Sequence, residues 1–124
     1  MRLLVALCVW AAAATAVAAE DDWQETVLQT STLEKVYKAS GVYQLCIGEQ
    51  LRGQANNKQD PRAVTDNILK ACEEKLQPMR DAFTAEKVPE QIADRYLRKT
   101  RTQAARGLIR EVMGMQAMRQ AAPN

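Results

Sequence analysis

Two cysteines are the residues of this chain whose spacing bears most directly on chemistry. Cys46 and Cys72 lie 26 positions apart, which is too far for the C-x-x-C spacing of a thiol redox pair. The third cysteine, Cys8, lies in an N-terminal segment that we expect to be removed. An even pair of cysteines in an exported protein is typical of a structural disulfide. We therefore predict a Cys46–Cys72 bond, with two buried free thiols as the alternative.

Histidine, the residue that most often acts as a general base in enzymes, is missing from the sequence. The chain of 124 residues contains no histidine, which removes the commonest general base, the Ser–His and Cys–His nucleophile pairs and imidazole metal sites. Carboxylates adjoin at Glu73-Glu74 and Asp21-Asp22, but neighbouring positions on a helix point in different directions. No glycine-rich phosphate loop is present. We predict no catalytic residues, no metal site and no cofactor, and we do not expect an enzyme.

Basic residues near the C-terminus provide a candidate binding face. At about 100° per residue, five of them fall within roughly a third of a helix circumference. An acidic protein or an anionic envelope component such as lipopolysaccharide or anionic lipid would suit such a face. The alternative is an ordinary solvated helix surface. The five residues, called the basic face below, are Arg95, Arg98, Lys99, Arg106 and Arg110.

The overall charge argues against a nucleic-acid ligand. The formal net charge is only +2, and proteins that bind nucleic acids are usually more basic, with aromatic residues interleaved among the basic ones. The first half of the chain is acidic, so its charges also allow pairing with the basic half, within one molecule or between copies in a homo-oligomer. Three methionines near the C-terminus, Met113, Met115 and Met118, offer thioethers that suit Cu(I). Met113 points away from the other two on a helix, so we predict ordinary packing or a frayed tail rather than a copper site.

Helical periodicity places these residues on three segments. Ser31 to Glu34 fits a capping box, and apolar residues then recur on one side of a helix as far as Leu51. Three glycines weaken this helix, and we expect them to permit close packing against a neighbour: Gly41, Gly48 and Gly53.

The second and third segments begin at prolines. Asp60-Pro61 suits a helix start, and apolar residues follow at steps of three or four up to Phe83. Pro78 should kink or break this helix near Leu76-Gln77. A third helix is predicted from about Glu90 to about Met118.

The two cysteines also predict how the first two helices pair. Their numbers average to 59, inside the polar turn at 54–59, so an antiparallel hairpin brings them to the same height. We predict an all-α fold, a small antiparallel bundle of three main helices with one disulfide across a helical hairpin. The helical domain covers 31–118, after a loose acidic segment at 20–30 and before a frayed tail at 119–124.

The N-terminus has the three parts of a secretory signal peptide. Arg2 supplies the positive start, residues 3–14 an apolar run, and Ala16-Val17-Ala18 a small-x-small cleavage site. We predict a signal peptide at 1–19 that is cleaved after Ala18 or Ala19. The mature protein is then expected to be periplasmic or secreted, with the bacterial periplasm as the favoured location. The apolar run is shorter than the roughly 20 residues of a membrane helix; the alternative is an uncleaved anchor. No transmembrane segment is expected after cleavage.

The surroundings of the cysteines resemble those of a known group of proteins. Tyr43-Gln44-Leu45-Cys46, followed by Ala71-Cys72 with a proline between them, is similar to small exported proteobacterial proteins of unassigned function. The resemblance covers residues 37 to 83 and implies a disulfide-linked hairpin in the cell envelope. A more distant likeness is to periplasmic acid-stress chaperones. Since neither names an activity, we expect a binding or structural module of the envelope, with a stress chaperone as the alternative.

Overall fold

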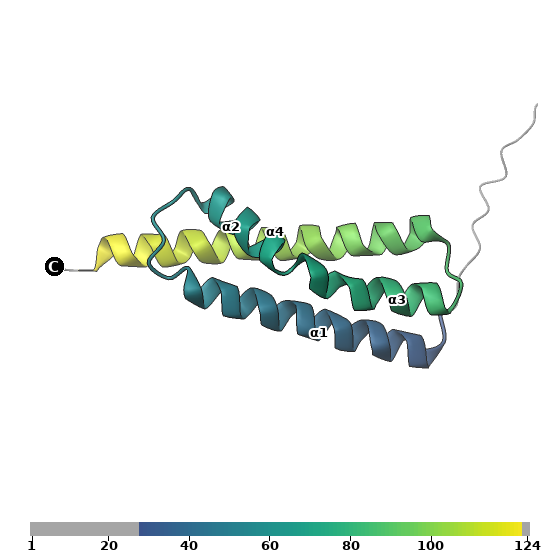
Figure 1. Ribbon diagram of the computed structural model, residues 1–124. Helices are drawn as coiled ribbons and strands as arrows, with labels where there is room; N and C mark the ends of the chain where they lie inside the picture. The colour runs from purple at the N-terminus through teal and green to yellow at the C-terminus, as the bar shows by residue number, and fades with distance from the viewer. Residues whose placement is uncertain (1–27, 123–124) are drawn as a thin grey trace, which may run out of the picture.

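A computed structural model describes residues 28–122 of the protein as a bundle of helices (Figure 1). The two long helices are α1 (Thr30–Gly53) and α4 (Glu90–Ala121). A broken third arm of α2 (Pro61–Ala71), a short 3₁₀ helix η1 (Glu73–Leu76) and α3 (Gln77–Ala85) packs against both. The described residues contain no strand. The predicted all-α antiparallel bundle is therefore confirmed.

Several expectations concern residues beyond this range. The predicted signal peptide at 1–19 and the acidic segment at 20–30, apart from its last residues, lie outside the described residues. At the other end, α4 continues three residues past the predicted end at Met118, into the part expected to fray. Arg119 holds this last part of α4 against the turn before α2, because its Nη2 donates a hydrogen bond to the backbone carbonyl of Asn57 at 2.9 Å.

The hairpin about residue 59 is present as predicted. Cys46 and Cys72 are joined by a disulfide, with their Cα atoms 5.9 Å apart. At the far end of the same hairpin, the Thr32 hydroxyl donates a hydrogen bond to the Glu86 carboxylate. The two pairs have the same midpoint, so the register holds along the length of α1.

A second antiparallel register centres on residue 87, between α3 and α4. Arg80 pairs with Asp94 and Arg101 with Glu73, and both pairs have this midpoint. Nearer the C-terminus, Gln116 Nε2 donates to the carbonyl of Gln59 at 2.8 Å, close to the same register. The broken arm therefore folds back along α4 over nearly its whole length.

The second predicted helix breaks earlier than expected. The α-helix ends at Ala71, and residues 73–76 form the 3₁₀ helix η1 before α3 begins at Gln77. Pro78 lies in the first turn of α3, where its missing N–H would have no helical partner in any case. The predicted break is confirmed, but it begins at Cys72, at the disulfide, rather than near Leu76-Gln77.

The first helix starts differently from the prediction. Gln29 is its N-cap, and no side chain caps it, so the capping box predicted at Ser31 to Glu34 is wrong. Thr32 lies inside the helix, is buried and donates a hydrogen bond to Glu86 across the bundle. By contrast, Asp60 caps α2 as predicted, accepting a hydrogen bond from the Arg62 amide at 2.8 Å.

The glycines of α1 do not serve close packing. A Cβ atom added at Gly41 or Gly53 would meet nothing within 4 Å, and one added at Gly48 would only touch the Arg52 guanidinium. The expectation of close helix contact at these positions is therefore wrong.

The core lies between the two long helices and the broken arm. It includes buried residues from every element, among them Val36, Tyr43, Ile68, Leu76, Met79, Phe83, Leu97, Leu108 and Val112. Among the helices that the structure describes, none combines the length and the apolar character needed to cross a bilayer.

Candidate binding face on the fourth helix

All five residues of the basic face are exposed on α4. They lie away from the buried stripe of the same helix, which consists of Ala93, Leu97, Ala104, Leu108 and Val112. A rise of about 1.5 Å per residue spreads the face over roughly 22 Å from Arg95 to Arg110. The structure therefore presents one elongated row of cations.

Two other charged residues of α4, Asp94 and Arg101, form ion pairs across the bundle. Asp94 lies 2.5 Å from Arg80 of α3, and Arg101 lies 3.1 Å from Glu73 of η1. Within residues 28–122, no member of the basic face forms an ion pair. Arg110 instead donates from Nε to the backbone carbonyl of Arg106 at 3.2 Å, so its side chain lies along the helix.

Arg98 lies at the edge of the basic face, in a cleft between α4 and the broken arm. Arg80 and Arg101 line the same cleft of about 360 Å³, and the buried side chains of Leu76 and Leu97 contribute apolar surface to it. Sequence reasoning missed Arg80 and Arg101 as its partners. The turn at 86–89 was recognisable, and the midpoint rule applied there would have paired both arginines with their carboxylates.

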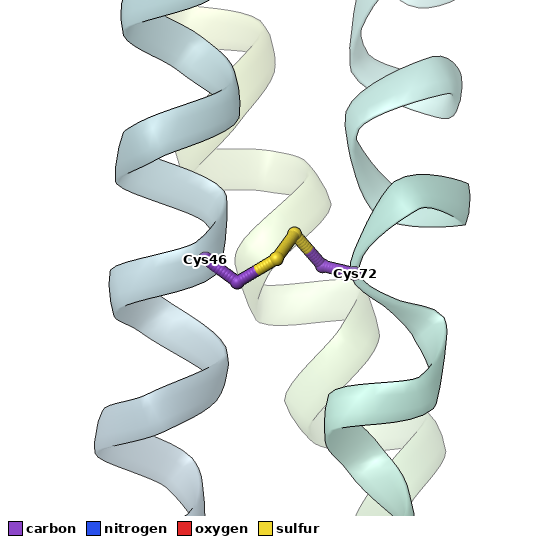
Figure 2. The surroundings of a disulfide bond; sticks show 2 residues. All are labelled: Cys46 and Cys72. Atoms are coloured by element: carbon purple, nitrogen blue, oxygen red, sulfur yellow. A yellow bond between two sulfur atoms is a disulfide. The ribbon is translucent and has the colours of Figure 1, made fainter.

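The disulfide connects α1 to the break between α2 and α3 (Figure 2). Cys72 is fully buried, whereas Cys46 is only partly so. Tyr43 lies one turn before Cys46 and is fully buried as well, and its hydroxyl has no hydrogen-bond partner in the described part of the chain. Burial raises the pKa of Tyr43, and Glu73 raises it further, while Arg101 opposes them. This neighbourhood holds the fold together and offers no open thiol.

Other candidate ligands stay apart. In the described range, no three Cys, Asp or Glu side chains gather closely enough to hold a metal ion. Met115 is partly buried and packs against the core, while Met113 and Met118 are exposed. Packing therefore accounts for one methionine of the three.

Comparison with known proteins adds no relative. The chain matches no protein-family model, no curated protein and no solved structure.

Proposed function

We propose that this protein is an exported binding module of the cell envelope and that its basic face holds an anionic partner. The observation that carries the proposal is the contrast along α4. The charged residues that face the neighbouring arm, Asp94 and Arg101, are paired across the bundle. The five cations that face outward have no ion-pair partner within residues 28–122.

The spacing of the basic face supports a role outside folding. Arg95 and Lys99, and likewise Arg106 and Arg110, are four residues apart, and like charges at this spacing destabilise a helix by about 0.2–0.5 kcal/mol per pair. A partner with a row of negative charges relieves this repulsion when it binds. These two pairs slightly weaken the helix in the free protein, and an anionic partner would offset that effect.

Export is supported by two features. The N-terminal residues have the parts of a signal peptide, and disulfides persist mainly in oxidising compartments. The periplasm of a bacterium and the outside of the cell both meet that condition.

The proposal is tested by removing the charges without changing the shape. In the face variant, Arg95, Arg98, Lys99, Arg106 and Arg110 are replaced by Gln. In the matched control, five exposed cations on other elements are replaced by Gln: Arg52, Lys58, Arg62, Lys70 and Lys75. Both variants lose the same net charge, so only the location differs.

Binding is measured by cosedimentation with vesicles containing phosphatidylglycerol and by retention on heparin. The face variant should lose about tenfold or more in affinity, and the control much less, because only neighbouring cations act together on one anionic surface. Raising the salt should weaken wild-type binding, since exposed charges are screened beyond about 10 Å at 0.1 M. Equal losses in the two variants, or no binding by the wild type to either probe, would contradict the proposal.

A second candidate, a stress chaperone, is favoured by the large apolar side chains left exposed. Tyr37, Leu45 and Met118 each expose about 70% of their surface, and the disulfide lies at the break of the arm. Reduction of the disulfide should then expose further apolar surface. The reduced protein should suppress the aggregation of an unfolding client protein. Client aggregation that is the same with and without the protein, before and after reduction, excludes this role.

A further inference from the structure

An apolar groove runs between α1 and α3, with a volume of about 470 Å³. Ala39 and Val42 line it from α1, and Pro78, Ala82 and Ala85 line it from α3. Three of the lining residues are alanines, and Ala39 lies within about one helical turn of the height of Ala82 in the register about residue 59. Because alanine side chains are short, the groove between the two helices has room for a large side chain from another segment or molecule.

The charges at the edge of the groove are unevenly distributed. Lys35 and Lys38 line its α1 side, and Asp81 is the acidic residue of its α3 side. None of these three forms an ion pair within the described residues. An occupant that suits this groove carries one large apolar group and several carboxylates.

We propose that the occupant is segment 20–27 of this chain, with Trp23 seated on the alanines. The segment has the sequence Glu-Asp-Asp-Trp-Gln-Glu-Thr-Val and so combines one large aromatic residue with four carboxylates. The segment lies outside the described residues. A Trp side chain buries roughly 150–250 Å² when it docks, and the carboxylates then meet the two lysines.

The chain is long enough to reach. Leu28 packs against the core just before the start of α1, at the end of the bundle where α3 finishes and where Lys35 and Ala85 line the groove. Five extended residues span about 16 Å at roughly 3.3 Å each. The distance from Thr30 to Ala39 along α1 is about 14 Å at 1.5 Å per residue. Because Leu28 lies two residues before Thr30, a segment that folds back along α1 brings Trp23 to the end of the groove lined by Lys35 and Ala85.

The basic face is the competing site for the same carboxylates. It offers more positive charge, but the cleft at its edge is lined mainly by charged side chains and presents less apolar surface to an indole than the groove does. The groove supplies both parts, so we assign the segment to the groove. This inference does not depend on the proposed function.

Trp23 itself reports the test. Trp10 and Trp23 are the two tryptophans of the chain, so Trp10→Phe in the full chain leaves Trp23 as the only indole. Its emission should be blue-shifted relative to the same chain in denaturant, and acrylamide should quench it severalfold less. Both effects should be lost in Val42→Glu, which places a charge in the groove, and be reduced in the double variant Lys35→Glu with Lys38→Glu.

Leu45→Glu is the matched control, because Leu45 is exposed on α1 but does not line the groove. It should leave the emission unchanged, and circular dichroism checks that every variant is folded. Emission typical of water in the parent chain, or emission unaffected by both groove variants, would overturn the inference. So would a red shift caused by the face variant alone, which would place Trp23 on α4. A blue shift that disappears on dilution would assign the groove to the segment of a second copy and overturn the intramolecular assignment.

Discussion

At the scale of single residues, Tyr43 contains a polar group that the fold does not use. Its side chain is fully buried between α1 and the other helices, yet its hydroxyl has no hydrogen-bond partner among the described residues. A buried polar group without a partner costs about 1–3 kcal/mol. The aromatic ring packs in the core, so this free-energy cost comes from the hydroxyl oxygen alone.

Tyr43→Phe should therefore raise the free energy of unfolding by about 1 kcal/mol, because the ring is kept and the unpaired oxygen is removed. Urea denaturation at neutral pH measures the change. Tyr37→Phe is the control, since Tyr37 is 69% exposed, and it should have little effect. A lower stability in Tyr43→Phe would mean that the hydroxyl has a partner after all.

The same substitution has a pH signature. Because burial raises the pKa of Tyr43 above its ordinary value of 10.0, the unfolded chain releases this proton first as the pH rises. This titration leaves the free energy of unfolding unchanged below about pH 10 and lowers it as the pH rises above that value. The wild type should thus lose stability more steeply than Tyr43→Phe above about pH 10. Parallel curves across that range would contradict the assignment.

The sequence predicted the burial of the Tyr43 ring but not the lack of a hydrogen-bond partner for its hydroxyl. The helical spacing of the apolar residues in this helix predicted that the ring of Tyr43 faces the core, and Tyr43 is buried. The same spacing placed Tyr37 on the apolar side, and this prediction is wrong, because Tyr37 is 69% exposed. Whether the Tyr43 hydroxyl finds a partner depends on which atoms of the other helices lie within about 3 Å. No pattern along one helix contains that information. The exposure of the five basic residues was predictable for the opposite reason, because it depends only on their position around α4.

At the scale of elements, the turn between α3 and α4 shows how one residue ends a helix. Lys87 has a positive φ of 56°. Its amide donates to the carbonyl of Thr84 at 3.0 Å, and the amide of Val88 donates to that of Phe83 at 3.1 Å. This is the Schellman arrangement, in which glycine is the usual residue at the left-handed position.

Lys87→Gly should increase the stability by about 1 kcal/mol, since a side chain in the left-handed region costs roughly 1–2 kcal/mol and part of the gain is lost to the flexibility of glycine when unfolded. Thermal unfolding measures it. Lys87→Ala removes the same charge but keeps the Cβ atom, so it should give no such gain. Equal effects of the two substitutions would show that charge, not conformation, matters at this turn.

The limits of the elements were predictable where a local signal existed. Asp60 capping Pro61 and the proline before Glu90 both mark helix starts that the structure contains. The break at Cys72 was placed too late because the sequence offers only Pro78 as a signal. The 3₁₀ turn that begins at Glu73 lies beside the disulfide, so its position reflects a contact with α1 as well as local propensity.

At the scale of the whole molecule, the disulfide closes the hairpin that the rest of the fold is built on. Cys46 and Cys72 are 26 positions apart in sequence, and they connect α1 to the middle of the broken arm. The chain that the structure describes is about one small domain, and such domains are stable by only about 5–15 kcal/mol. A single cross-link is therefore a large share of the total.

Replacing both Cys46 and Cys72 by Ala should lower the free energy of unfolding by roughly 3–4 kcal/mol, the chain-entropy value for a loop of this length. Denaturation with urea, with and without reductant, measures this. The reductant should destabilise the wild type by a similar amount and leave the double variant unchanged. A wild type that is indifferent to reductant would mean that the bond is absent from the purified protein.

The architecture as a whole was more predictable than the site. The pairing of α1 with the arm was predictable because the midpoint of the two cysteines, residue 59, falls inside the polar turn at 54–59. A functional site on this molecule depends instead on what binds to it. The five cations of α4 show the sign and the length of a complementary surface and carry no information about whose surface it is.

The two registers, about residues 59 and 87, need different parts of the chain. The register about residue 59 pairs α1 with the broken arm, and both cysteines lie upstream of α4. A chain delivered from its N-terminus can therefore close its covalent link while α4 is still absent. The last helix then docks onto a scaffold that is already cross-linked, so a mismatch in α4 would leave a bonded hairpin with an open apolar side.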